Sequence, residues 1–220
     1  MEQLKKYIAW LLCRLGFSAN GLTVLGLLFA LGSGALVYRG HLRWAAVALL
    51  FSGFLDMMDG AVARLSGSND KFGGILDSSF DRYGDALILG GVLFYYARQS
   101  SILYAGLAFS ALMGSFEISY VRARTECEMP SCRVGFWERG ERIVFLSLGL
   151  LFHNVALVLW ILGIGTHWTA MQRLLRSRRH ALVASAEISS PAPPSTRQQP
   201  LYWAKVLALA ALAALLRPPF

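Results

Sequence analysis

The segment LDMMDGAVARLSGSNDKFGGILDSSFDRYGD, residues 55–85, carries two groups of aspartates between long apolar runs. An ionised carboxylate is costly inside a membrane, so acids in such segments usually face a polar cavity and carry function. Asp56 and Asp59 are three residues apart, and Asp77, Asp81 and Asp85 follow at intervals of four. Each group therefore lies on one face of a helix. The short connection predicts that the two helices are antiparallel neighbours, with both groups meeting at one end.

The composition is that of a membrane protein. Hydrophobic residues make up 55% of the 220 residues, and the mean hydropathy is +0.48. These values favour an all-α, polytopic integral membrane protein built as one helical bundle. The net charge of +8 is explained by membrane topology, because the basic residues lie between apolar segments and form no separate basic domain. We therefore expect no nucleic-acid partner.

Six membrane-spanning helices are predicted. A span needs about 20 mostly apolar residues. Four candidates lie at about 20–38, 42–64, 74–97 and 102–121, and two share residues 141–173, with a break near His153 and Asn154. The first 17 residues predict an amphipathic helix on the membrane surface, with Trp10 as an interfacial anchor.

The basic residues predict the orientation of these spans. With the N-terminus in the cytoplasm, the opposite side holds only Arg39, Arg43 and Arg98. This asymmetry predicts a multi-pass protein of the cell membrane with both ends of the core domain in the cytoplasm. That domain is expected at residues 1–180, followed by a Pro/Ser-rich linker at 181–200 and an apolar tail of unassigned role at 201–220.

Converging carboxylates repel one another, and four or five in one place require cations. Hard oxygen ligands suit Mg²⁺ or Mn²⁺, and two ions held by shared aspartates would stabilise the charge of a phosphoryl-type displacement. Gly60, Gly73 and Gly74 would allow a nucleotide to approach the backbone, and Arg64 would reach a diphosphate. The alternative is that such acids simply pair with arginines at the membrane surface, which becomes less plausible for two facing groups.

The spacing of these residues resembles a family signature. The pattern Asp56-x2-Asp59-Gly60-x2-Ala63-Arg64, followed by Gly73-x3-Asp77-x3-Asp81, is similar to that of the CDP-alcohol phosphotransferases. The resemblance extends to about Arg179. It implies a six-helix bundle, commonly a homodimer, whose site opens to the cytoplasmic leaflet. It also implies a CDP-linked lipid donor, usually CDP-diacylglycerol, and an alcohol acceptor, with CMP as the leaving group.

The resemblance assigns roles by position. Asp56, Asp59 and Asp77 would bind metal, and Asp81 would act as general base and also touch a metal. The implied CDP-binding residues are Gly60, Ala63, Arg64 and Gly73, joined by Asn20 and Thr23 of the segment SANGLT. That segment has Ala19 where the family usually has proline.

Arginines at cytoplasmic helix ends predict an acceptor that carries a phosphate. Guanidinium groups bind phosphate in a bidentate manner, and Arg122, Arg124 and Arg173 can converge beside the carboxylates. The SYVRAR segment, the WERGER loop and the late QR pair resemble the inositol-phosphate branch of the family. By that likeness the acceptor phosphate is bound by Ser119, Arg122, Arg124 and Arg173, with Arg139 and Arg142 as further candidates.

Three other interpretations stay open at this point. Glycerol 3-phosphate also carries a phosphate, and any single arginine is explained as well by membrane topology. A membrane prenyltransferase would also use aspartates and Mg²⁺, although its aspartate motifs are typically far apart in sequence. A cation or proton transporter would explain buried carboxylates, but the sequence has no inverted repeat.

Overall fold

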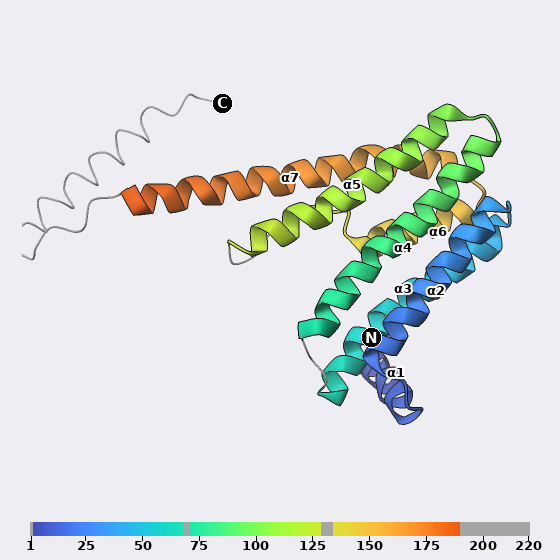
Figure 1. The fold of residues 1–220 in the computed structure, drawn as a ribbon, viewed down its shortest axis with the longest axis horizontal. Coiled ribbons are helices and arrows are strands. Elements are labelled where there is room, and N and C mark those ends of the chain that lie inside the picture. The colour runs from blue at the N-terminus through green and yellow to red at the C-terminus, as the bar shows by residue number, and fades with distance from the viewer. Residues whose placement is uncertain (1, 68–70, 129–133, 190–220) are drawn as a thin grey trace, which may run out of the picture. The chain divides into compact units, whose positions relative to one another are not determined.

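The computed structural model describes residues 2–67, 71–128 and 134–189, all of them helical or in short connections (Figure 1). The helices are α1 (Glu2–Arg14), α2 (Ala19–Tyr38), α3 (Leu42–Ser66), α4 (Lys71–Arg98), α5 (Ile102–Glu126), α6 (Arg139–Leu151) and α7 (Val155–Ser189). The predicted all-α fold is confirmed for this part of the chain. The predicted tail at 201–220, and residues 190–200 of the predicted linker, lie outside the described residues.

Four of these helices are long and apolar enough to cross a membrane: α2, α3, α5 and residues 155–182 of α7. Helix α4 is long but carries three aspartates beside its basic residues, and α6 has only 13 residues. Large apolar side chains such as Leu28, Phe94 and Ile164 are exposed, which is typical of a surface that contacts lipid. The chain is therefore a multi-pass membrane protein.

The helix boundaries follow from local sequence signals. Ser18 begins α2, since its hydroxyl oxygen accepts a hydrogen bond from the backbone N–H of Gly21 at 3.1 Å. Gly67 ends α3 in the left-handed conformation, with φ of 67°. The predicted break near His153 and Asn154 is confirmed, because α6 ends at Leu151, α7 begins at Val155 and His153 has φ of 59°.

The packing of α3 and α4 differs from the expectation that they are close neighbours. Both helices pack along α2 more extensively than against each other, as the course of α2 and α4 in Figure 1 illustrates. Two glycines of α2 explain this arrangement. A Cβ at Gly26 would lie 3.5 Å from the Ser52 carbonyl oxygen of α3, and a Cβ at Gly34 would overlap the backbone of Leu87 in α4. Small residues thus let α2 approach each helix closely.

Two buried apolar clusters hold the helices together. The smaller joins α1, α2 and α3 through Ala9, Leu22 and Met58, so it supports the end of the bundle that carries the aspartates. The larger cluster contains residues from every helix between α2 and α7, among them Leu49, Val92 and Leu159. Helix α6 packs on α3, and α5 packs on α4. These contacts belong to a unit formed by residues 1–177; the described remainder, residues 178–189, continues α7.

Replacement of Gly34 by alanine should destabilise the protein. The new methyl group would meet backbone atoms of α4, so the two helices would have to separate. Overpacking of this kind costs about 1–3 kcal/mol. Gly32→Ala is the matched control on the same helix, since a Cβ there meets nothing within 4 Å. Thermal unfolding in detergent should show a lower midpoint for Gly34→Ala alone, and equal midpoints would contradict this account of the α2–α4 contact.

Candidate functional site

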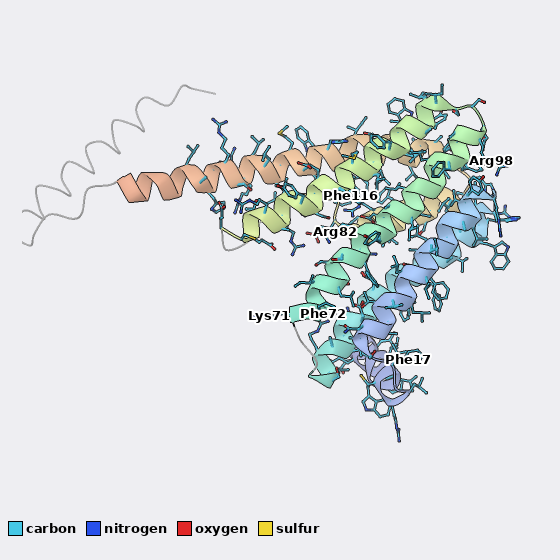
Figure 2. All side chains as sticks on the ribbon, viewed as in Figure 1. Phe17, Lys71, Phe72, Arg82, Arg98 and Phe116 are labelled. Carbon is cyan, nitrogen blue, oxygen red and sulfur yellow. The ribbon has the colours of Figure 1, made fainter. Side chains whose placement is uncertain are left out.

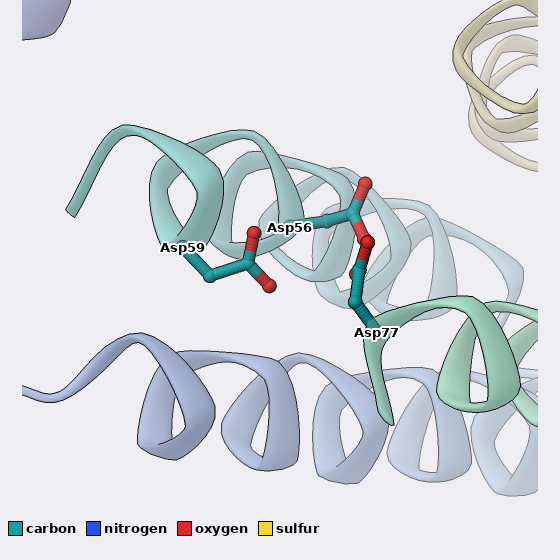
Figure 3. Close-up of side chains that lie close together, drawn as sticks. All are labelled: Asp56, Asp59 and Asp77. Carbon is teal, nitrogen blue, oxygen red and sulfur yellow. The ribbon is translucent and has the colours of Figure 1, made fainter. Parts of the chain in front are cut away.

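Three aspartates converge at one end of the bundle. Asp56 and Asp59 of α3 point toward Asp77 of α4 (Figure 3), and one carboxylate oxygen from each lies within 4.8 Å of the others. The sequence places Asp56 and Asp59 almost one helical turn apart, which is why both reach the same point. Three hard anionic oxygens at this separation fit a divalent cation such as Mg²⁺ or Mn²⁺. The predicted convergence of these three carboxylates is confirmed, and their role as metal ligands stays a prediction.

The Asp59 carboxylate is held from two sides. Its Oδ2 accepts a hydrogen bond from the Thr23 hydroxyl of α2 at 2.8 Å, and its Oδ1 accepts one from the Gly60 N–H at 2.5 Å. Only 5% of Asp59 is exposed. Neither donor carries a charge, so the two hydrogen bonds orient the carboxylate without forming an ion pair.

Asp81 lies beside this cluster and pairs with an arginine. Its Oδ1 is 2.6 Å from Nη1 of Arg139, the first residue of α6. The same nitrogen also contacts Asp56, so a single guanidinium joins one of the three converging aspartates to Asp81, the predicted general base. A buried charge needs such a partner to offset its desolvation. The position of Asp81 therefore depends on α6 as well as on α4.

A second arginine of α6 neutralises Asp85. Nη2 of Arg142 lies 2.6 Å from Oδ2 of Asp85, and both side chains are largely buried. Arg142 also donates to the carbonyl oxygen of Trp137 at 3.1 Å. This ion pair lies deeper than the Asp81–Arg139 pair and connects α4 to the start of α6. Asp85 is thus a further aspartate of α4 beyond the family motif, and Arg142 is its ion partner.

A cavity of about 180 Å³ borders Asp59 and Asp77 of the three converging aspartates. It is lined by Ala19, Asn20, Thr23, Asp59, Gly60, Ala63, Arg64, Gly73, Gly74 and Asp77. All six residues predicted to bind CDP are in this lining. The structure thus brings together residues from α2, α3 and α4 around one space beside the carboxylates.

A larger cavity of about 490 Å³ also borders Asp77. It is lined by five of the six residues predicted to bind the acceptor phosphate: Ser119, Arg122, Arg139, Arg142 and Arg173. The sixth, Arg124, is not in the lining; its side chain is exposed and pairs with Glu128 at 2.6 Å. Asp81 and Asp85 also line this cavity. Asp77 lines both cavities, so the two spaces share one of the three converging aspartates.

Sequence reasoning missed four charged residues of the larger cavity: Arg82, Glu126, Glu138 and Glu141. Arg82 of α4, labelled in Figure 2, lies in its lining and donates to the Ser78 carbonyl oxygen one turn earlier. Glu138 lies there too and pairs with Arg173 at 3.5 Å. The position of Arg82 directly after Asp81 was the available signal for that residue. The place of Glu138 depends on how the segment before α6 packs against α7.

Arg173 combines a place at the larger cavity with extensive backbone contacts. Its Nε donates to the Val134 carbonyl oxygen at 2.9 Å, and its Nη1 donates to the Ile118 carbonyl oxygen at 3.0 Å. Only 2% of the residue is exposed. It therefore holds together α5, α7 and the segment before α6, a role that its predicted assignment to the acceptor did not include.

Comparison with known proteins identifies the family. A model of the CDP-alcohol phosphatidyltransferases matches residues 17–186. The chain belongs to the CDP-alcohol phosphatidyltransferase family. The match covers all of the aspartates described above and ends beyond the predicted boundary near Arg179.

Two relatives within the family are named as synthases of inositol-lipid phosphates. The archaetidylinositol phosphate synthase of Pyrococcus horikoshii is 34% identical over 76% of this chain and 87% of its own length. The phosphatidylinositol phosphate synthase of Corynebacterium glutamicum is 34% identical over 80% of this chain and 84% of its own length.

Solved structures of a related enzyme have the same fold. Phosphatidylinositol phosphate synthase of Mycobacterium tuberculosis with bound CDP-DAG superposes with a TM-score of 0.73 at 28% identity, covering 80% of this chain and 94% of the other. The same enzyme in complex with manganese and citrate gives a TM-score of 0.70 at 29% identity, covering 79% and 88%. The predicted family and its membrane-enzyme class are thus confirmed.

Replacement of Asp85 by asparagine should destabilise the protein strongly. It would leave the buried charge of Arg142 without its ion partner, which costs about 3–5 kcal/mol in comparable cases. Glu128→Gln is a suitable control, because its pair with Arg124 is exposed and such pairs contribute about 0–1 kcal/mol. Unfolding in detergent measures both variants, and an equal effect would contradict the structural role given to the Asp85–Arg142 pair.

Proposed function

We propose that this protein transfers a phosphatidyl group from CDP-diacylglycerol to inositol phosphate and releases CMP. The observation that carries the proposal is the pair of cavities that share Asp77, one lined by the family's nucleotide signature and the other by arginines. The names of the relatives support an acceptor that carries inositol phosphate, and the CDP-DAG bound to the mycobacterial enzyme supports this donor. The enzyme would act in phospholipid biosynthesis.

Two divalent ions, Mg²⁺ or Mn²⁺, are proposed at the aspartates. Asp56, Asp59 and Asp77 would hold them, and Asp81 would contribute from α4. Such ions would stabilise negative charge on the diphosphate and on the departing CMP. The manganese named for the mycobacterial enzyme supports a divalent metal.

Asp81 is proposed as the general base. It lines the larger cavity, so an acceptor bound there would place its hydroxyl near this carboxylate. Asp81 would take the hydroxyl proton while the hydroxyl oxygen bonds to the lipid-side phosphorus. The bond from that phosphorus to the oxygen of CMP would break, and CMP would leave with the bonding electrons. Arg139 would hold Asp81 in place through their ion pair.

The acceptor phosphate is proposed to bind the arginines of the larger cavity. Arg122 is the most accessible of these, with a side chain 34% exposed, whereas Arg142 and Arg173 are largely buried. Guanidinium groups hold a phosphate dianion with paired hydrogen bonds. Ser119, in the same lining, would add a hydroxyl donor. Arg124 pairs with Glu128 outside this cavity, which argues against a direct contact with the acceptor.

In the membrane, we propose six spans formed by α2 to α7, with α1 on the cytoplasmic surface and both ends of the core domain in the cytoplasm. Exposed Leu4, Tyr7 and Trp10 on α1 support a membrane-facing side of that helix. A homodimer is proposed by analogy with the family alone. The nucleotide and acceptor cavities would open toward the cytoplasmic leaflet, where both substrates are available.

Substitution of Asp81 by asparagine should abolish most of the activity. Loss of a general base lowers a rate by about 10²–10⁴-fold. The assay measures CMP released by detergent-solubilised protein from CDP-diacylglycerol and inositol 1-phosphate with Mg²⁺. Wild-type CMP release that requires inositol phosphate would establish the acceptor. Release with glycerol 3-phosphate instead would retain the mechanism and replace the acceptor, and an unchanged rate in Asp81→Asn would contradict its role.

Replacement of Arg122 by glutamine should raise KM for inositol phosphate. A lost hydrogen bond to a charged group costs about 1.5–3 kcal/mol, which corresponds to about 10- to 100-fold. Arg124→Gln is a closely matched control. Both arginines lie near the C-terminal end of α5, and each pairs with a glutamate four residues later. Only Arg122 lines the cavity, so KM should change little in Arg124→Gln. A larger change in Arg124→Gln than in Arg122→Gln would restore the original expectation for Arg124.

A further inference from the structure

Thr23 occupies a position between the nucleotide cavity and the carboxylates. It lies on α2, one turn after Ala19, and its hydroxyl oxygen is 2.8 Å from Oδ2 of Asp59 and 3.1 Å from the Ala19 carbonyl oxygen. A hydroxyl has one proton to donate. The charged oxygen of Asp59 is the stronger acceptor, and it is also the closer one. The Thr23 proton is therefore directed at the carboxylate.

The surroundings make this hydrogen bond rigid. Thr23 is 8% exposed and Asp59 is 5% exposed. Asp59 is also fixed at its other oxygen by the Gly60 N–H, so each carboxylate oxygen has one donor and the plane of the group is set. The lone pairs that remain can be shared with an ion held together with Asp56 and Asp77. Partners of this kind orient metal ligands and tune their affinity.

We propose that Thr23 is a positioning residue that orients Asp59 for metal binding, and that it does not act chiefly by contacting the nucleotide. The inference rests on the proposed metal site. Thr23 joins the first turns of α2, which line the nucleotide cavity, to the metal ligand on α3. A movement of α2 beside the nucleotide would therefore shift the Thr23 hydroxyl and, with it, the Asp59 carboxylate.

The test measures Mn²⁺ binding to the full-length protein in detergent by electron paramagnetic resonance, in the absence of nucleotide. Thr23→Val keeps the shape of the side chain and removes the hydroxyl, and we expect about tenfold weaker binding or more, the range found for lost partners of metal ligands. Thr23→Ser retains the hydroxyl and should restore the wild-type affinity. That rescue would not occur if the side chain served only for packing.

Ser33→Ala is the matched control. Ser33 is also a buried hydroxyl of α2 that donates to α3, with its oxygen 2.8 Å from the Ala45 carbonyl oxygen, but its acceptor is no carboxylate. Its loss should leave the Mn²⁺ affinity unchanged. An equal weakening in Ser33→Ala and Thr23→Val would assign the effect to general α2–α3 packing and overturn the proposal.

Further measurements separate this inference from the proposed function. If Asp59→Asn abolishes Mn²⁺ binding and Thr23→Val does not weaken it, the metal site stands and the role of Thr23 is overturned. Weaker binding of CMP by metal-free Thr23→Val, with unchanged Mn²⁺ affinity, would likewise assign Thr23 to the nucleotide. If wild-type protein binds no Mn²⁺, or Asp59→Asn binds it normally, the metal site falls and this inference falls with it.

Discussion

The structure depends on placing several carboxylates together where water is scarce. Each must be offset by a partner, because an isolated buried charge is costly. Arg139 contacts both Asp56 and Asp81, and Arg142 pairs with Asp85. Asp59 accepts hydrogen bonds from two neutral donors and belongs to the group proposed to hold a cation. Asp85 is thus paired with α6 alone, whereas Asp56 both contacts Arg139 and belongs to the group proposed to hold metal.

The ion pairs of Arg139 and Arg142 hold the start of α6 against α3 and α4. Its first turn carries Arg139 and Arg142, and each reaches a different aspartate. Arg173 of α7 holds the preceding segment through the Val134 carbonyl oxygen and Glu138. The arginines that border the larger cavity therefore also maintain the carboxylate site. The proposed binding of the acceptor would fall on the same side chains, so substitutions among them are expected to change both binding and stability.

Much of this arrangement could be predicted from the sequence because it depends on helical spacing. The aspartate convergence, the break between α6 and α7 and the grouping of the residues predicted to bind CDP all follow from local patterns. The same spacing could have separated Arg122 from Arg124, since residues two apart lie on nearly opposite sides of a helix. The packing of α3 and α4 along α2 required Gly26 and Gly34 to face different helices, which depends on helix rotation. The hydrogen bond from Thr23 to Asp59 likewise needs the register of α2 against α3, and one sequence does not contain that information.

The larger cavity combines two kinds of side chain in a way that bears on the acceptor. Arg122, Arg139 and Arg142 supply positive charge, while Asp81, Glu126 and Glu138 supply hydrogen-bond acceptors in the same lining. A simple phosphate would gain nothing from those acidic groups and would be repelled by them. A phosphate attached to a body with several hydroxyl groups could use both, because each hydroxyl can donate to a carboxylate. At about 490 Å³ the cavity has ample room for such a molecule. Its charge pattern therefore favours a phosphorylated polyol with many hydroxyls over a smaller one, for the same reason that a site built to bind a hydroxyl discriminates against an analogue that lacks it.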